Sequence, residues 1–145
     1  MTHLNFISNL IHFWNENELS KTIDESPENT NSWLARCNLY FEFAIFKQSA
    51  SDFKEAIWLE INDDDTHYYL AQSYFLGEQY TESIDEWSYL IGKNVEEVEY
   101  YSLRGWAYRK SGDYKLPEAD YEKAISLTLD MTKNTSREIY LSNTI

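Results

Sequence analysis

Residues 105–125, GWAYRKSGDYKLPEADYEKAI, decide the fold of this chain because the same pattern occurs twice more upstream. Steps of 34 residues lead without a gap to AQSYFLGEQYTESIDEWSYLI at residues 71–91 and to CNLYFEFAIFKQSASDFKEAI at residues 37–57. Aromatic residues coincide at three positions, and an isoleucine ends each stretch. The matched positions are Tyr40, Tyr74 and Tyr108; Phe46, Tyr80 and Tyr114; Phe53, Trp87 and Tyr121; and Ile57, Ile91 and Ile125. A fixed period of this length is typical of solenoid repeats.

Each repeat has the apolar spacing of two helices joined by a turn. In the third repeat, Tyr101, Gly105 and Tyr108 share one helical face, and a second apolar stripe follows a Ser-Gly-Asp sequence. Glycine suits a helix end, and aspartate suits the start of the next helix. The predicted helix pairs span residues 30–63, 64–97 and 98–131. One such pair cannot bury its apolar face alone, but stacked pairs can.

The third repeat resembles the tetratricopeptide repeat (TPR) family. The residues that carry the resemblance are Arg104-Gly105, Ala107-Tyr108, Asp113-Tyr114, Asp120-Tyr121 and Ala124-Ile125. The likeness extends over about residues 30–131 and implies an all-α fold, a right-handed α-solenoid of antiparallel helix pairs. It implies one TPR domain over residues 1–145 with helical caps at both ends. Members of the family mostly act as protein-binding scaffolds, so the resemblance says little about the partner.

Pro117 stands where the family usually has alanine. In the family, a small residue of the first helix meets a small residue of the second, here Gly105 and Pro117. The corresponding pairs in the earlier units are Cys37 with Ser49 and Ala71 with Ser83. We expect Gly105 to open space for a bulkier ring. We also expect the helix that contains Pro117 to begin about one turn late. Proline is tolerated near a helix start, because the backbone N–H that it lacks would have no acceptor within the helix there.

The two ends of the chain lack the marks of the repeat. Residues 1–29 are predicted to form a degenerate helix pair, with a broad apolar first helix and a second helix from Asn15 to about Glu25. The pair would cap the first repeat, and an alternative is that its apolar face binds a partner or a second copy. Residues 132–145 are predicted to form a C-terminal capping helix.

The chain is strongly acidic. It has 145 residues, with 25 acidic against 12 basic residues and a net charge of -13. Such a surface repels nucleic acid and anionic membranes, since affinity for both depends on Lys and Arg. We find no apolar run long enough to span a bilayer, and the single cysteine excludes an internal disulfide. We therefore expect a cytoplasmic protein whose partner is a basic protein, and its oligomeric state is left open.

The acidic residues concentrate in one stretch. Residues 64–97 carry eight acidic residues against Lys93 alone, a net charge of -7, whereas residues 98–131 are close to balanced. An even solubilising coat would not need this gradient, which favours a docking surface. The candidate acidic partner-binding residues are Asp64, Asp65, Glu82, Asp85 and Glu86.

We find no sequence pattern for catalysis. The three histidines have no partner at a zinc-ligand spacing, and Cys37 occupies a crowded helix–helix position. Asn62-Asp63-Asp64-Asp65 lacks the glycine and the distal glutamate of a calcium loop, so its acids are expected to cap the next helix. No nucleophile elbow, P-loop or dinucleotide fingerprint occurs. We expect no enzyme activity, no metal and no cofactor.

The resemblance places a binding groove on the first helix of each pair. The candidate groove residues are Asn38, Phe41, Tyr68, Tyr69, Gln72, Phe75, Trp106 and Arg109. Aromatics flanked by amides and charges are the composition of protein-binding hot spots. Some TPR domains grip a chaperone's C-terminal carboxylate with groove cations. At the matching positions this chain has Leu34, Asp65, Tyr69, Glu99 and Leu103, and only Asn38 fits the family's pattern. A carboxylate would be repelled there, so we reject the role of a co-chaperone that binds this C-terminal carboxylate.

Several functions remain compatible with the sequence. The first is a non-catalytic module that binds and masks a basic protein, as an immunity protein or antitoxin does, with electrostatics setting the association rate. The second is a secretion-type TPR chaperone for an apolar client segment. The third is a regulator that senses a peptide or small ligand in its groove. A structural adaptor is a further alternative.

Overall fold

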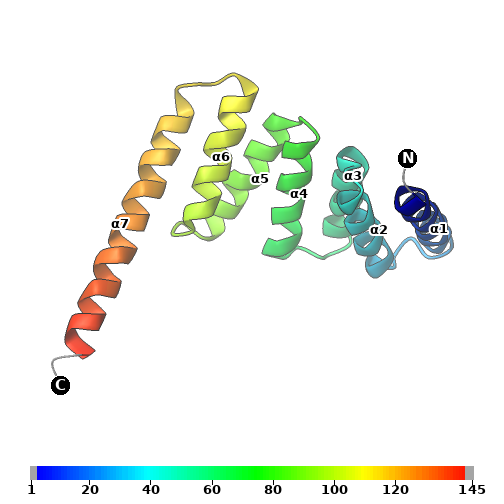
Figure 1. Cartoon of the computed structure of the whole chain (residues 1–145), viewed down its shortest axis with the longest axis horizontal. Helices are drawn as coiled ribbons and strands as arrows, with labels where there is room; N and C mark the ends of the chain where they lie inside the picture. Colours follow the sequence, from blue (N-terminus) through cyan, green and yellow to red (C-terminus); the bar gives the residue numbers. More distant parts are fainter. Residues whose placement is uncertain (1–2, 143–145) are drawn as a thin grey trace. The chain divides into compact units, whose positions relative to one another are not determined.

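The computed structural model describes the backbone of residues 3–142 and the side-chain surroundings of residue 13 and residues 15–134. Seven helices make up this part of the chain (Figure 1), and no strand occurs in it. Their bounds are α1 His3–Glu25, α2 Thr30–Glu42, α3 Phe46–Trp58, α4 Asp64–Leu76, α5 Tyr80–Lys93, α6 Val98–Ser111 and α7 Leu116–Ser142. The predicted fold class, an all-α chain of antiparallel helix pairs, is confirmed.

The 34-residue period reappears in the backbone. The helices α2, α4 and α6 begin at residues 30, 64 and 98, where the predicted units begin. The turn inside each pair has a residue with positive φ at Ala44, Glu78 and Gly112. The residue after each of these donates its N–H to the carbonyl of Tyr40, Tyr74 or Tyr108 respectively. A left-handed conformation costs a non-glycine residue about 1 kcal/mol, and only the third turn uses glycine to avoid this cost.

The helices divide into two compact units, residues 1–79 and residues 80–145. The first, unit 1, contains α1 to α4. The second, unit 2, contains α5 to α7. Within each unit a helix packs on its neighbour in the sequence. None of the helices in residues 3–142 combines the length and apolar character needed to cross a bilayer.

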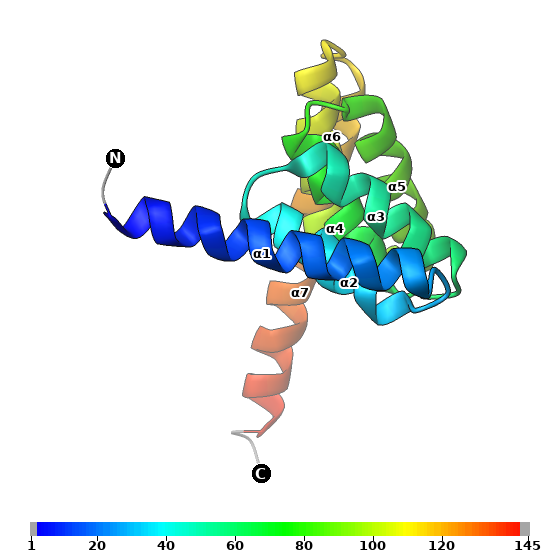
Figure 2. The same cartoon turned by 90° about the vertical axis from the view of Figure 1, so that its right-hand side faces the viewer.

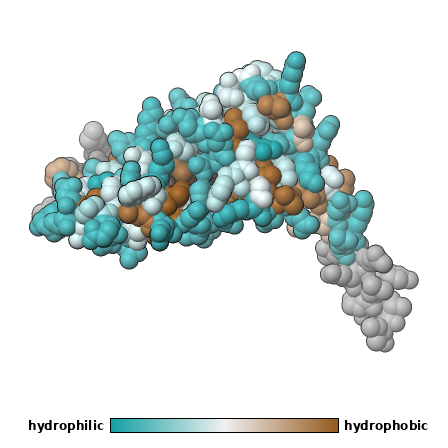
Figure 3. Space-filling view, turned by 180° about the vertical axis from the view of Figure 1, so that it is seen from behind, coloured by the Kyte–Doolittle hydropathy of each residue, from teal (hydrophilic) through white to brown (hydrophobic). Residues whose placement is uncertain are grey.

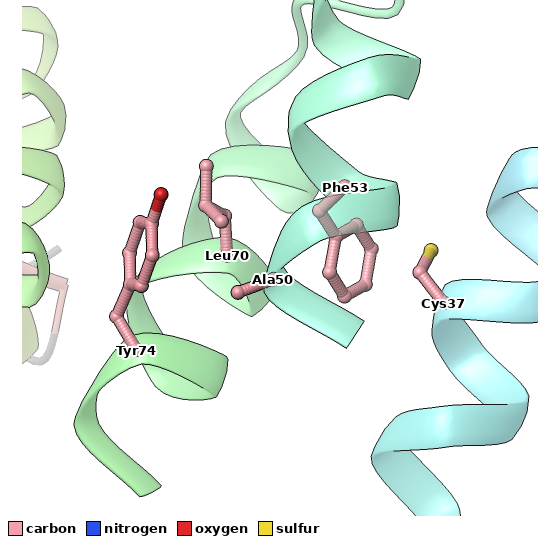
Figure 4. Close-up of a cluster of buried hydrophobic side chains, with 5 residues drawn as sticks. All are labelled: Cys37, Ala50, Phe53, Leu70 and Tyr74. Carbon is pink, nitrogen blue, oxygen red and sulfur yellow. The ribbon is translucent and has the colours of Figure 1, made fainter. Parts of the chain in front are cut away.

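The core of unit 1 joins α2, α3 and α4. Figure 4 shows its five buried side chains, which are Cys37 of α2, Ala50 and Phe53 of α3, and Leu70 and Tyr74 of α4. The expected contact between Cys37 and Ser49 is present, because the Ser49 hydroxyl donates to the Cys37 carbonyl at 2.9 Å. Small side chains at these two positions therefore bring α2 and α3 close together.

The core of unit 2 joins α5, α6 and α7 through Ile91, Tyr101 and Ala124. A Cβ atom on Gly105 would lie 2.9 Å from Cε1 of Tyr121, closer than real contacts allow. Gly105 therefore makes room for the Tyr121 ring, whereas the sequence predicted that it would face Pro117. The loss of a side chain at this position lets α7 approach α6 with an aromatic ring between them.

The N-terminal prediction is wrong in one respect, because residues 3–25 form the single helix α1 rather than a helix pair. Figure 2 shows α1 lying along α2, with its N-terminal end extending beyond it. The spacing of Asn15 and Glu18 is that of a capping box and predicts a helix start, but no proline or glycine interrupts the chain before Pro27. The second half of α1 follows the 34-residue register, since Ile23 is buried and corresponds to Ile57 and Ile91. It acts as the second helix of a preceding repeat.

The separate capping helix predicted over residues 132–145 is also not observed. Helix α7 continues without a break from Leu116 to Ser142, and the remaining predicted residues lie outside the described part. The 34-residue register of α3 and α5 places the start of α7 at residue 114, but α7 begins two residues later, at Leu116. The delay has the predicted direction and is about half of the predicted helical turn. The Asp113 carboxylate accepts hydrogen bonds from the N–H groups of Lys115 and Leu116. Pro117 follows in the first turn, where its missing N–H costs nothing.

Candidate functional site

The candidate site in unit 1 is a group of aromatic rings on α2 and α4. Phe41 of α2 contacts Tyr69 of α4 edge to face, with ring centroids 5.8 Å apart. Tyr68 contacts Tyr69 in the same way at 5.6 Å, and the Gln72 amide donates to the Tyr68 hydroxyl at 3.1 Å. We call Phe41, Tyr68, Tyr69 and Gln72 the aromatic surface. All four are predicted groove residues, and the structure brings them together.

Rings of α3 hold the aromatic surface in place. Tyr69 stacks on buried Phe53, with centroids 6.2 Å apart and an interplanar angle of 10°. Phe41 contacts Phe46 edge to face at 5.7 Å. Tyr69 nevertheless keeps 44% of its surface exposed. A ring that is fixed on one face and open on the other loses little conformational entropy on binding, as at interface hot spots.

The aromatic surface borders a cavity of about 440 Å³ in unit 1. The cavity is lined by the turn between α2 and α3 and by the end of α4. Its lining includes Ile45, Phe46 and Leu76, together with Lys47 and Glu78. Phe46 links the two features, because it lines the cavity and its ring contacts Phe41 of the aromatic surface. The cavity could therefore receive an apolar side chain of a molecule that binds the rings.

Two further predicted groove residues of unit 1 flank these rings. Asn38 is exposed on α2, about one turn before Phe41, and Phe75 is half-buried on α4. Their part in binding remains a prediction.

The predicted groove residues of unit 2 line a cavity at the end of α6. Trp106 and Arg109 lie around a cavity of about 340 Å³ together with Lys110 and Tyr114. The indole of Trp106 and the ring of Tyr114 are exposed. Both cations are in the last turn of α6, where they also interact favourably with the helix dipole. This group is distinct from the aromatic surface and has a more basic composition.

The five predicted acidic residues are shared between the two units. Asp64 and Asp65 are exposed in the first turn of α4 in unit 1. Glu82 and Asp85 are exposed and Glu86 is half-buried on α5 in unit 2. The expected capping role falls to neighbouring Asp63, whose carboxylate accepts from the Thr66 N–H at 2.7 Å. Asp64, Asp65 and Glu82 lie in the first turn of their helices, where acidic side chains interact favourably with the helix dipole. The role of all five residues in binding remains a prediction.

The structure also contains an interaction that sequence reasoning missed. In unit 1, Arg36 of α2 makes a two-point ion pair with Asp52 of α3, with N···O distances of 2.7 and 2.9 Å. Its third nitrogen donates to the Ser20 hydroxyl of α1 at 2.9 Å. We call this arrangement an arginine clasp, because one guanidinium joins three helices. The Asp52 carboxylate beside it raises the pKa of Arg36, so the pair stays charged.

Unit 2 contains the same arginine clasp, 68 residues further along. Arg104 of α6 pairs with Asp120 of α7 at 2.9 and 2.6 Å and donates to Ser88 of α5 at 3.0 Å. The three residue types recur at twice the repeat period, which is the sequence signal that could have found them. The corresponding positions of the middle repeat hold Leu70, Glu86 and Lys54, which cannot form the clasp. Each clasp fixes the packing of the helices in its own unit, and none of its residues belongs to the aromatic surface.

The structure describes the surroundings of Cys37 and His67, two side chains that occur often in catalytic sites. Burial raises the pKa of the Cys37 thiol to about 12, so it carries no reactive thiolate at neutral pH. His67 lies 2.7 Å from the Asn62 side-chain oxygen, a contact that orients the ring at the start of α4. Among the residues whose side chains the structure describes, no group of three or more His, Cys, Asp or Glu could hold a metal ion.

Comparison with known proteins identifies structural neighbours only. No protein-family model matches the chain, and a search of curated proteins finds no match. Among solved structures, MamA from MSR-1 superposes with a TM-score of 0.71 at 13% identity, covering 87% of this chain and 72% of its own. MamA from Desulfovibrio magneticus RS-1 gives a TM-score of 0.68 at 16% identity, covering 86% and 71%. A further MamA crystal structure gives 0.65 at 20% identity, covering 77% and 66%.

These superpositions support the fold. At identities this low, they carry no information about the partner of this chain. MamA has a TPR-like all-helical structure, and the likeness covers most of this chain. It agrees with the 34-residue period of helix starts and of left-handed turn residues. The chain therefore has the fold of a tetratricopeptide-type helical repeat protein.

Proposed function

We propose that this chain is a non-catalytic protein-interaction module that binds and masks a basic protein, in the manner of an immunity protein or antitoxin. The observation that carries the proposal is the aromatic surface, where exposed Tyr69 is held by Phe41 and buried Phe53. Fixed aromatic rings with an open face are the groups that dominate protein–protein binding energy.

The charge of unit 1 supports a basic partner. Residues 1–79 contain 13 acidic and four basic residues, a net charge of -9 out of -13 for the whole chain. Of the four basic residues, Arg36 is already neutralised by Asp52. The rings also attract cations directly, because the face of an aromatic ring is electronegative. Lysine or arginine side chains of a partner would therefore gain from both the acidic surroundings and the rings.

The experiment starts with affinity capture of partners from the native host, using the wild type, Tyr69→Ala and Trp58→Ala. Trp58 is a matched control, since it is an exposed aromatic residue of the same unit on α3. The captured protein is then purified, and its binding to each variant is measured by calorimetry between about 0.05 and 0.5 M salt. Circular dichroism shows whether each variant keeps its helical content.

We expect Tyr69→Ala to weaken binding at least about tenfold, as for a hot-spot residue, and Trp58→Ala to leave it unchanged. Binding to a basic partner weakens as salt rises, because screening removes the attraction. A partner that binds wild type and Tyr69→Ala equally well would refute the role of the aromatic surface. Binding that does not respond to salt would refute the electrostatic part.

A second function is favoured by the cavity beside the rings. Ile45, Phe46 and Leu76 give it an apolar lining, which suits a chaperone that holds an apolar client segment. Such binding would depend on Leu76 and change little with salt. A Leu76→Asp substitution that abolishes capture while the salt response is flat would therefore support the chaperone function over masking of a basic protein.

A further inference from the structure

Unit 2 carries a group of exposed basic and aromatic side chains at the end of α6. Trp106, Arg109 and Lys110 lie on this helix, and Tyr114 lies in the turn that follows it. The exposed fractions of Trp106 and Tyr114 are 51% and 70%, and both cations are exposed as well. Side chains three and four positions apart share one face of a helix, so the three helical residues face the same region of solvent. We call these four residues the cationic surface.

The two cations of the cationic surface are not neutralised by neighbouring acids. Within the described part of the chain, neither Arg109 nor Lys110 has an ion pair. Residues 109–115 contain three basic residues and one acid, a local charge of +2 in a chain whose net charge is -13. The acid is Asp113, whose carboxylate already accepts two backbone N–H groups at the start of α7. Two adjacent cations repel each other, and an anionic ligand relieves this repulsion.

Two neighbouring cavities of about 340 Å³ each lie at the cationic surface. They are neighbours because Arg109 and Tyr114 line both. The lining of the first cavity is completed by Trp106 and Lys110, and that of the second by Pro117, Glu118 and Tyr121. The first cavity therefore has a basic lining, whereas the second is lined mainly by rings. Figure 3 shows hydrophobic surface bordered by hydrophilic surface at the end of unit 2 that carries the turn between α6 and α7.

The two linings indicate the chemistry of a ligand that fills both cavities. The basic cavity suits a carboxylate, which the guanidinium of Arg109 can hold through two parallel hydrogen bonds. The second cavity suits an apolar side chain. Alternate side chains of an extended peptide point to the same side, so one segment can place a carboxylate and an apolar group in neighbouring cavities. Trp, Tyr and Arg are also the residue types most enriched at protein-binding hot spots.

We propose that the cationic surface binds an acidic segment of a partner protein. A carboxylate of the segment pairs with Arg109 and Lys110 in the first cavity, and a neighbouring apolar side chain enters the second. The segment is short, because a long polyanion would meet the acidic residues that surround the site in a chain of net charge -13. A short segment is attracted mainly by the local positive charge, since screening limits the reach of more distant charges to about 8 Å at physiological salt.

This site goes beyond the proposed function, because it takes a ligand of the opposite charge. The aromatic surface of unit 1 is proposed to bind basic side chains, which the two cations of unit 2 would repel. Trp106 and Arg109, two predicted groove residues, are therefore assigned to a separate site with its own ligand. The two sites lie on different units and share no residue. Substitutions at one site therefore test it without altering the other.

The test starts with random peptides displayed on phage and selected on the immobilised full chain at about 0.1 M salt. The wild type, the double variant Arg109→Gln with Lys110→Gln, and Tyr69→Ala are used in parallel. We expect the wild type to enrich peptides in which Asp or Glu lies close to an apolar residue. The double variant is expected to lose these peptides, and Tyr69→Ala to retain them. Basic peptides that bind the aromatic surface would show the opposite response, so failure of the proposed function is distinguished from failure of this site.

The affinity of one selected acidic peptide is then measured by calorimetry. Arg109→Gln is expected to raise its dissociation constant at least about tenfold. Arg109→Lys restores only part of the affinity, because an ammonium group cannot form two parallel hydrogen bonds with a carboxylate. Lys123→Gln is the matched control, since Lys123 is an exposed cation of α7 that lines neither cavity. It is expected to leave the dissociation constant nearly unchanged, and circular dichroism shows whether each variant keeps its helical content.

Three results would overturn the proposal. The first is a wild-type selection that enriches no acidic peptides. The second is an equal loss of affinity in Arg109→Gln and Lys123→Gln, because total charge rather than this site would then decide binding. The third is displacement of the peptide by inorganic phosphate at an equal concentration, because the site would then hold any small anion rather than a protein segment.

Discussion

Breaking the arginine clasp of unit 1 tests how this fold is held together. The change is Arg36→Met, which keeps most of the side-chain volume and removes the charge. It leaves the Asp52 carboxylate, whose side chain is only 6% exposed, without its two-point partner. Ser20 loses a hydrogen bond as well. The reverse change, Asp52→Leu, leaves an arginine that is more exposed and can turn towards water.

The expected cost follows from the burial of the two charges. Removing one partner of a buried ion pair costs about 3–5 kcal/mol. The clasp is near the surface of the helix pair, with Arg36 at 16% exposure, so we expect about 2–3 kcal/mol for Arg36→Met. Asp52→Leu is expected to cost less, about 1–2 kcal/mol, because no buried charge remains. The double variant Arg36→Met with Asp52→Leu is expected to cost less than the sum of the two single changes, since an apolar pair replaces an ionic pair.

The assay is urea unfolding followed by circular dichroism at 222 nm, for the wild type, both single variants and the double variant. Arg104→Met serves as a parallel change in unit 2, where Asp120 has the same environment. If the two units unfold in separate transitions, each arginine variant is expected to shift the transition of its own unit. A cost below about 0.5 kcal/mol for Arg36→Met, the level of an exposed ion pair, would refute the reasoning. Strict additivity of the two single changes would refute the coupling.

The remaining predictions concern Gly105 and Cys37. Gly105→Ala is expected to destabilise the chain by about 1–3 kcal/mol, because the new Cβ atom would press on the Tyr121 ring. Gly92 has open space around it, so Gly92→Ala is expected to stabilise α5 by about 0.5 kcal/mol. Thermal unfolding measures both changes. Cys37 is expected to resist a thiol reagent at pH 8 in the native chain and to react once unfolded, since its pKa is raised from 9.0 to about 12. The stability from its neutral thiol is complete below about pH 9 and is lost as the pH rises towards 12; rapid native-state labelling would contradict this.

The aromatic surface could be located in part from the sequence. The resemblance to the TPR family implied that Phe41, Tyr68, Tyr69 and Gln72 are groove residues, and the structure brings them together in unit 1. The sequence does not show that Tyr69 rests on Phe53 or that Phe41 touches Phe46, because these rings meet only when α2, α3 and α4 pack. Their exposed area, on which binding depends, is therefore a tertiary property.

The sequence by itself determined where the repeating helices begin. Local causes set these starts, namely the spacing of apolar residues and the residues at each turn, so residues 30, 64 and 98 follow from the 34-residue period. The sequence also indicated that Gly105 makes room for a ring, but only the packing of α6 against α7 showed that this ring is Tyr121.

Only the tertiary structure decided how the ends of the chain are built and how the repeats are held together. Between His3 and Glu25, and in α7 after Pro117, no proline or glycine separates one long helix from two short ones. Packing over whole helices decides between these alternatives. Each arginine clasp likewise joins residues that are 16 positions apart and lie on different helices. The sequence spacing does not show that these side chains lie within hydrogen-bond distance, because only the packing of the helices brings them together.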